Sequence, residues 1–307
     1  MTNTSKTVVF FGNERLATAV TTAAPTLQAL IKAGYHIPAV ISHNEVANSR
    51  KPRTLEIAEV ATAHKIPILL PEKPVDILEQ LKEYRADIGV LVAYGKIIPE
   101  SIINSFPHGI VNIHPSLLPL HRGSIPIESV ILEGAKKTGV SLMQLVKTMD
   151  AGPVYAQEKF TMPLGIDKQQ LADQLLVQGS SLVIEHLPAI LDRSLEPTPQ
   201  DDSLASYDNL IQKEDGVIDW TKPAEMLERE VRAYLNWPKS RATIAGAEVI
   251  ITKSHVKNGS GKPGSVWREA NQFGFYTTKD ILVIDTLKPA SKSEMPASAY
   301  LAGYKLG

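Results

Sequence analysis

Short apolar runs alternate with segments of helical periodicity over the first 114 residues, and this alternation constrains the fold more than any other feature. The apolar runs cover residues 7–11, 37–42, 66–70, 88–95 and 109–114. The first helical segment has Pro25 in its first turn and Gly34 just past its end. Strands separated by helices of about ten residues are typical of βαβ units. The pattern therefore predicts an α/β domain with a doubly wound, mostly parallel sheet of Rossmann-like type.

The pattern changes after the fifth run. A helix is predicted over 127–134, followed by two strands over 139–146 and 154–160 with the short loop "KTMDAGP" between them. These strands are expected to extend the sheet as a hairpin-like pair. A long helix over 167–191 then completes the domain. We predict that this domain spans residues 1–192.

A polar stretch with two prolines and no periodicity, "RSLEPTPQDDS", follows the long helix. It predicts a linker over residues 193–206. Beyond it, a helix is predicted over 223–234 and short strands over 241–246, 248–256, 273–278 and 281–285. A helix with a small antiparallel sheet is typical of an OB-like β-barrel. Residues 207–307 are therefore predicted to form a second domain of that type.

The chain has no cysteine among its 307 residues, which excludes disulfides, thiolate catalysis and Cys-ligated metal sites. The formal net charge is −1, so no global charge points to nucleic acid, although a local basic patch can still bind it. The N-terminus lacks the features of a signal peptide, and no run reaches the ~18 apolar residues of a membrane span. We expect a cytoplasmic protein that has no membrane contact and acts as a monomer.

The fifth run opens the sequence "VNIHPSLLPLHRG", which puts polar residues into a predicted buried strand. Asn112 and His114 are two residues apart, so their side chains point to the same face. Ligands of open α/β sheets bind beyond the carboxyl ends of the strands, where this pair is expected. Asp150, on the predicted turn before Gly152, adds a carboxylate. Together these groups can stabilise an oxyanion, move a proton and hold an imidazole in its charged form.

Other interpretations of these residues are open at the level of the sequence. His114 can be a structural histidine, and Asp150 can simply stabilise its turn. His114, His121 and Asp150 can also be read as a two-His, one-carboxylate metal site, although no compact ligand cluster supports it. A nicotinamide site is disfavoured because "FFGNERLATA" lacks the G-x-G-x-x-G pattern.

The motif "NIHPSLLPLHRG", with "MDAG" downstream, resembles the signature of the folate-dependent formyltransferases. The resemblance implies that Asn112, His114 and Asp150 are catalytic, that no metal is needed, and that 10-formyltetrahydrofolate is the formyl donor. It also implies a folate site made of Val92, Ala93, Tyr94 and Gly95 together with a wall of Ser116, Leu117, Leu118 and Pro119.

The second half is similar to the members of this family that formylate the α-amine of initiator methionyl-tRNA. "YDNLIQKEDGVIDWTKPAEMLEREVRAYLNWP" resembles the start of their C-terminal domain, and "LKPASKSEMPASAYLAGYKLG" resembles its end. The resemblance implies initiator Met-tRNA and folate as partners. The alternatives are a formyltransferase acting on a nucleotide-linked amino sugar, a 10-formyltetrahydrofolate hydrolase, and an RNA-binding protein that has kept the fold without the activity.

Basic residues in two places are expected to contact tRNA. Six basic residues and one acidic residue lie between positions 239 and 268. Among them, Lys253, Lys257 and Lys262 are expected to meet phosphates. In the loop after the second strand, where the family usually has a longer and more basic loop, the basic residues are Arg50, Lys51 and Arg53.

The sequence leaves two further features without an assigned role. Arg122 can meet a phosphate or the folate tail, or it can be a structural ion-pair partner. After the first strand, "FFGNERLA" replaces the Gly-Thr-Pro turn that is usual in the family.

Overall fold

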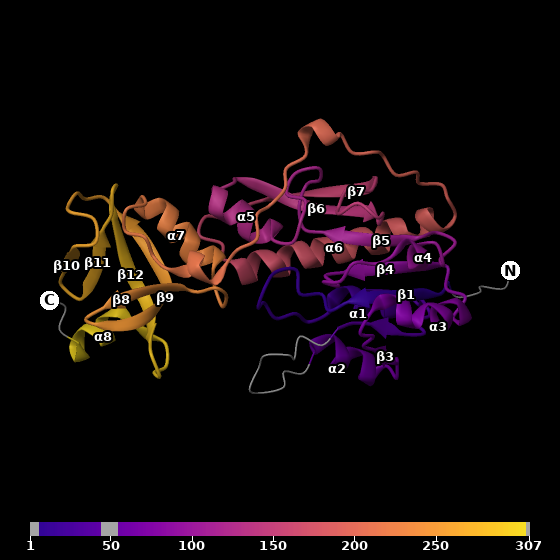
Figure 1. Ribbon diagram of the computed structural model, residues 1–307, viewed down its shortest axis with the longest axis horizontal. Helices are drawn as coiled ribbons and strands as arrows, with labels where there is room; N and C mark the ends of the chain where they lie inside the picture. The colour runs from indigo at the N-terminus through magenta and orange to yellow at the C-terminus, as the bar shows by residue number, and fades with distance from the viewer. Residues whose placement is uncertain (1–5, 44–54, 305–307) are drawn as a thin grey trace. The chain divides into compact units, whose positions relative to one another are not determined.

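A computed structural model describes residues 6–43 and 55–304 of the chain (Figure 1). The chain forms two compact units. Unit 1 comprises Met1–Pro126, Lys137–Met162 and Leu171–Asp208, and unit 2 comprises Ile127–Lys136, Pro163–Gln170 and Asn209–Gly307. The predicted linker, 193–206, therefore groups with unit 1, while two short stretches from within the predicted first domain group with unit 2. None of the described helices is both long and apolar enough to cross a membrane.

Unit 1 is built on a seven-stranded sheet in the order β3-β2-β1-β4-β5-β6-β7. Its strands are β1 (Val8–Gly12), β2 (Val40–Ile41), β3 (Ile68–Leu69), β4 (Ile88–Val92), β5 (Ile110–His114), β6 (Lys137–Gln144) and β7 (Val154–Thr161). The first five pair in parallel, whereas β6 and β7 pair antiparallel. The predicted doubly wound, mostly parallel sheet with an added hairpin pair is thus confirmed.

The helices of unit 1 are α1 (Pro25–Lys32), α2 (Glu56–Ala63), α3 (Leu78–Glu83), α4 (Glu100–Ile103) and most of α6 (Lys168–Leu191), with a short 3-10 turn at Pro74–Ile77. All but the first residue of α5 (Pro126–Glu133) groups with unit 2. Their packing follows from the strand registers. Phe11 lies opposite Leu91, and Leu91 lies opposite Asn112, so all three share one face of the sheet. Phe11 and Leu91 pack there with the apolar residues of α3 and α4. On the other face, Ile113 lies against Gly179 of α6.

The strand order reverses direction between β1 and β4, and this switch point lies at Gly12. Gly12 pairs with Val92 and has a φ of 124°. A Cβ at this position would lie 1.8 Å from the Val92 carbonyl oxygen, so only glycine fits. Ligands of doubly wound sheets bind in the crevice that such a reversal opens at the carboxyl ends of the strands.

Unit 2 contains an antiparallel sheet in the order β10-β11-β12-β9-β8, with β13 paired to β12. Its elements are α7 (Ala224–Ala233), β8 (Ser240–Ile244), β9 (Ala247–Lys257), β10 (Val266–Glu269), β11 (Gln272–Tyr276), β12 (Ile281–Pro289), β13 (Met295–Pro296) and α8 (Ala297–Gly303). Leu227 and Val231 of α7 and Tyr300 of α8 join the core formed by the strands. The predicted helix followed by a small antiparallel sheet is confirmed. The pattern misses β10, β13 and α8.

Candidate active site

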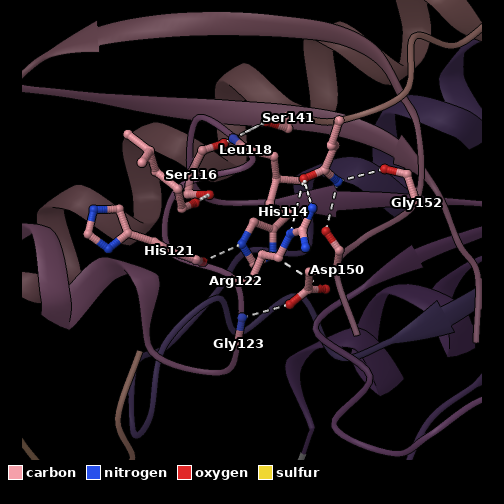
Figure 2. A network of polar contacts seen from close by, with 11 residues as sticks. His114, Ser116, Leu118, His121, Arg122, Gly123, Ser141, Asp150 and Gly152 are labelled. Carbon is pink, nitrogen blue, oxygen red and sulfur yellow. Dashed lines mark hydrogen bonds and ion pairs between the residues drawn. The ribbon is translucent and has the colours of Figure 1, made fainter. Parts of the chain in front are cut away.

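His114 is the last residue of β5, and its side chain is buried. Its Nε2 lies 2.9 Å from the carbonyl oxygen of His121. Because a carbonyl only accepts hydrogen bonds, this contact assigns a proton to Nε2. The other ring nitrogen, Nδ1, lies 3.8 Å from Oδ1 of Asp150, which is longer than a hydrogen bond. The structure thus brings the predicted histidine and carboxylate together, with Nδ1 turned toward the acid (Figure 2).

Asp150 lies on the turn between β6 and β7 with a φ of 49°, in the left-handed region. Its Oδ2 accepts a 2.8 Å hydrogen bond from the backbone N–H of Gly123. Gly152 follows in a place where a Cβ would be 1.9 Å from the Gln144 carbonyl oxygen. This tight turn leaves one carboxylate oxygen directed at His114 while the other is held by the loop that follows β5.

Asn112 is buried on the same face of β5 as His114, opposite Met143 of β6. Among the described residues, none forms a hydrogen bond with its side-chain amide. The amide is also absent from the described polar side-chain atoms that are both fully buried and unpaired, so it is open to solvent at the strand end. The side chain is therefore suited to meet a polar group of a ligand.

The predicted wall, Ser116–Pro119, lies across β6 and β7. Ser141 of β6 donates from its Oγ to the Ser116 carbonyl (2.6 Å) and accepts from the Leu118 N–H (3.1 Å). Gln157 of β7 donates from its Nε2 to the Leu118 carbonyl at 2.8 Å. These bonds fix the wall beside His114, which pairs with Ser141. Leu118 and Pro119 also line an open cavity of about 310 Å³ with residues 154–157 and 198–201.

The predicted folate segment Val92–Gly95 lies at the end of β4, beside the switch point at Gly12. Val92 is buried, Ala93 is partly exposed with a φ of 51°, and Gly95 is exposed. The ring of Tyr94 packs edge-on against Phe11 in the core, and burial raises the pKa of its hydroxyl to about 12. The tyrosine ring is therefore part of the core.

Arg122 is a structural residue in this arrangement. Its side chain is 2 % exposed, and its guanidinium donates to Gln200 Oε1 (2.9 and 3.1 Å), Asp202 Oδ1 (2.6 Å) and the Tyr207 hydroxyl (2.9 Å). With these partners, four of the five N–H donors of the guanidinium are used within unit 1. The alternative in which Arg122 meets a phosphate or the folate tail therefore does not fit.

The two-His metal interpretation does not fit the geometry either. The ring of His121 turns to Asp208, with Nδ1 3.0 Å from Oδ1, while only its carbonyl faces His114. Within residues 6–43 and 55–304, no group of three or more His, Cys, Asp or Glu side chains is arranged to hold a metal ion.

A buried polar cluster follows β1, where the sequence pattern indicates only an unusual turn. Glu14 is fully buried, and its carboxylate accepts hydrogen bonds from the backbone N–H groups of Thr26 and Leu27 at the start of α1, both at 2.8 Å. Burial raises the pKa of this carboxyl to about 7, against the opposing effect of the two N–H donors. Next to it, the Arg15 side chain forms an ion pair with Glu56 at the first turn of α2.

The basic residues expected to contact tRNA divide into two groups. Arg50, Lys51 and Arg53 lie outside the described residues. Lys253 and Lys257 are on β9, and Lys262 is exposed in the loop before β10. The Lys257 ammonium lies 2.8 Å from Glu269 Oε2 and 4.9 Å from the centre of the Trp267 ring. Its charge is therefore shared with an acidic partner one residue beyond the basic stretch 239–268.

Gln200 and Asp208 also contact residues of the site, although the sequence pattern marks neither of them. Both lie on residues 198–208, a segment with a 3-10 turn at Asp202–Leu204 that pairs with Val154 at Thr198 and with Arg122 at Tyr207 through isolated bridges. Gln200 contacts the Asp150 turn, and Asp208 contacts His121. Nothing in the local pattern marks either residue, because their partners are far away in the sequence.

A doubly wound sheet with Asn112, His114 and Asp150 at its strand ends, followed by a smaller antiparallel β unit, defines a two-part Rossmann-like enzyme. Two family models match this chain, "Formyl transferase" over residues 6–187 and "Formyl transferase, C-terminal domain" over residues 210–305. The chain belongs to the formyl transferase family.

Relatives match over nearly the whole chain. The methionyl-tRNA formyltransferase of Chloroflexus aurantiacus is 37% identical over 291 residues, covering 92% of this chain and 93% of that protein. The methionyl-tRNA formyltransferase of Roseiflexus castenholzii is 32% identical and covers 97% of this chain and 96% of that protein.

Solved structures share the fold at low sequence identity. HypX from Aquifex aeolicus has a TM-score of 0.69 at 18% identity, covering 99% of this chain and 50% of HypX. The N-formyltransferase from Helicobacter canadensis, solved with folinic acid and dTDP-3-aminofucose, has a TM-score of 0.68 at 19% identity and covers 91% of this chain and 98% of that enzyme.

Proposed function

We propose that this chain transfers the formyl group of 10-formyltetrahydrofolate to the α-amine of methionyl-tRNA, in the cytoplasm and as a monomer. The observation that carries the proposal is the likeness of both halves of the chain to methionyl-tRNA formyltransferases, at 32–37% identity over more than nine-tenths of their length. The convergence of His114 and Asp150 supports the same activity, since formyl transfer needs groups that act on charge and protons.

The site residues suit a folate-borne formyl group. The Asn112 amide has no described hydrogen-bond partner, and the hydroxyl of Ser141 holds the wall Ser116–Pro119 beside His114. We propose that this wall and the backbone of Val92–Gly95 hold the folate, and that the formyl oxygen meets Asn112.

The chemistry follows from what these side chains can donate. When an amine attacks the formyl carbon, negative charge develops on the formyl oxygen. The Asn112 amide can donate an N–H to that oxygen, and a single preorganised donor of this kind is worth about 3 kcal/mol of barrier.

His114 is suited to move the proton that leaves the amine. Its Nε2–H is held by the His121 carbonyl, which leaves Nδ1, on the side of Asp150, as the nitrogen that accepts and releases a proton. When Nδ1 is protonated, the Asp150 carboxylate stabilises the imidazolium by its opposite charge. The proton can then pass to the folate nitrogen that loses the formyl group.

A formyl-transfer assay with two competing acceptors tests the proposal. The purified chain receives 10-formyltetrahydrofolate with initiator Met-tRNA or with a dTDP-linked amino sugar. We expect formyl-methionyl-tRNA and no formylated sugar. Formylation of the sugar alone, or release of free formate without acceptor, would replace the proposal by one of the other activities. Light scattering of the same preparation tests whether the protein is a monomer.

A further inference from the structure

The side-chain amide of Gln200 bridges the Asp150 turn and Arg122. Its Nε2 donates to the carbonyl oxygens of Asp150 (2.8 Å) and Gly152 (2.6 Å). Its Oε1 accepts from Nε and Nη2 of Arg122 (3.1 and 2.9 Å). An amide has two N–H donors and one oxygen with two lone pairs, so every hydrogen-bonding capacity of this side chain is used.

The turn that Gln200 holds is one that needs support. Asp150 has a left-handed φ of 49°, a conformation that costs a non-glycine residue about 1 kcal/mol or more. Gly152 is pressed against the Gln144 carbonyl and has no room for a side chain. The direction of the Asp150 carboxylate toward His114 depends on this backbone conformation, because the side chain has only two rotatable bonds beyond it.

Arg122 fixes which way the amide of Gln200 points. A guanidinium only donates hydrogen bonds, so the oxygen of Gln200 must face Arg122 and its NH₂ must face the turn. Arg122 in turn is fixed by its bonds to Asp202 and Tyr207 and by its place in the chain. His121, the residue before Arg122, offers its carbonyl to His114, and Gly123, the residue after it, donates its N–H to Asp150 (Figure 2).

We propose that Gln200 is a positioning residue for catalysis, which holds the Asp150 turn in the conformation that aims the carboxylate at His114. The inference rests on the proposed function for its catalytic readout. It assigns a role in the active site to a residue that lies between the two family matches, which end at residue 187 and begin at residue 210.

The substitution Gln200→Glu separates this role from a general structural one. Glutamate keeps the oxygens that accept from Arg122, so the anchorage of the segment is retained. It replaces the NH₂ donor by an oxygen that faces the two carbonyls of the turn. We expect kcat to fall about 10- to 100-fold, the loss expected when reacting groups are misplaced by about 1 Å. KM for Met-tRNA and the melting temperature should stay close to those of the parent protein.

Asp192→Asn is the matched control, because it is the same exchange of acid and amide at an exposed position just after α6, outside the site. Asp192 accepts from the N–H of Ser194, and an asparagine oxygen can do the same. We expect the parent kcat. If the Gln200→Glu protein does not fold, Gln200→Met serves in its place, since it keeps the volume and removes both sets of hydrogen bonds.

A second measurement does not depend on turnover. Hydrogen exchange of the backbone amides of Gly123 and Ala151 should become faster in the Gln200→Glu protein, because the turn opens more often. A folded variant with the kcat of the parent and unchanged hydrogen exchange would overturn the inference. A fall in kcat accompanied by a proportionate fall in melting temperature would also overturn it. If the parent protein itself fails to formylate Met-tRNA, the proposed function fails, and the exchange measurement alone decides the role of Gln200.

Discussion

The backbone N–H of Gly123 donates a 2.8 Å hydrogen bond to Oδ2 of Asp150, so the loop that follows β5 holds the carboxylate facing the last residue of that strand. One oxygen of Asp150 is thereby used for structure, and the other is left for His114 at 3.8 Å. The two roles can be separated by a single substitution.

Asp150→Asn should abolish most activity while leaving the turn intact. The asparagine oxygen can accept from Gly123, and its NH₂ then faces His114 without a negative charge. Because the charge that stabilises the imidazolium is gone, we expect a loss of kcat as large as that from removing the histidine. Steady-state kinetics and a thermal melt measure the two effects. A variant with parent kcat and an unchanged pH–rate profile would show that Asp150 is only a turn residue.

Asn112→Ala and His114→Ala should each lower kcat by about 100-fold or more while leaving folate binding largely unchanged, because both groups act on charge that develops during the reaction. Folate affinity from fluorescence quenching, measured together with kcat, distinguishes an effect on the reaction from an effect on folate binding. An equal loss of folate affinity and rate in either variant would argue against that residue's proposed role. Ser124→Ala, at an exposed position of the following loop, is a suitable control.

The sequence predicts those parts of the site that depend on local geometry. Asn112 and His114 share a face because side chains alternate along a strand, and Asp150 falls on a turn because of the glycine and proline that follow it. The fold is predictable for a similar reason, since apolar runs and helical periodicity are local signals.

The rest of the site depends on contacts between residues far apart in the sequence. Arg122 and Gln200 are 78 positions apart, and His121 and Asp208 are 87 apart. A polar stretch with prolines looks like a linker unless its partners are known, so 193–206 carries no sign that it packs on the catalytic unit. Likewise, the pattern around "FFGNERLA" does not reveal that Glu14 is buried at the start of α1.

Glu14 should make the stability of the protein depend on pH. Its pKa is raised from 4.5 to about 7 in the folded state, so between these values the folded protein binds more protons than the unfolded chain. The stability associated with this group is therefore fully present below pH 4.5 and is lost as the pH rises through about 7. The shift corresponds to about 3 kcal/mol.

Glu14→Gln tests this linkage, since glutamine does not titrate. We expect the free energy of unfolding of the parent protein to fall relative to that of the variant between pH 5 and pH 8, by up to about 3 kcal/mol. Urea titrations at several pH values measure this difference in the free energy of unfolding. Two pH profiles that run parallel would mean that the carboxylate is already charged in the folded state at pH 5.

Neutralising Lys253, Lys257 and Lys262 together should weaken tRNA binding without changing kcat, if this face of unit 2 meets the tRNA backbone. Each phosphate contact on a duplex contributes about −0.9 to the slope of log affinity against log salt. We expect the slope to flatten by about two units rather than three, because Lys257 shares its charge with Glu269. KM for tRNA as a function of salt concentration is the measurement.

Glu269→Gln is the informative companion to that triple variant. It releases Lys257 from its partner, so tRNA binding should become tighter and more sensitive to salt. An unchanged slope in both proteins would mean that these lysines are merely solvated, and it would favour an acceptor that carries fewer phosphates.

The packing of residues 198–208 against the catalytic turn also limits how this enzyme can be taken apart. A fragment that ends with the first family match, at residue 187, would contain Asn112, His114 and Asp150 but lack the amide that bridges Arg122 and the turn. In that fragment the Arg122 guanidinium would lose Gln200, Asp202 and Tyr207 together, and the Asp150 turn would lose the amide that donates to its carbonyls. Truncation, domain exchange and the design of chimaeric formyltransferases should therefore cut after Asp208 rather than at the edge of the family match.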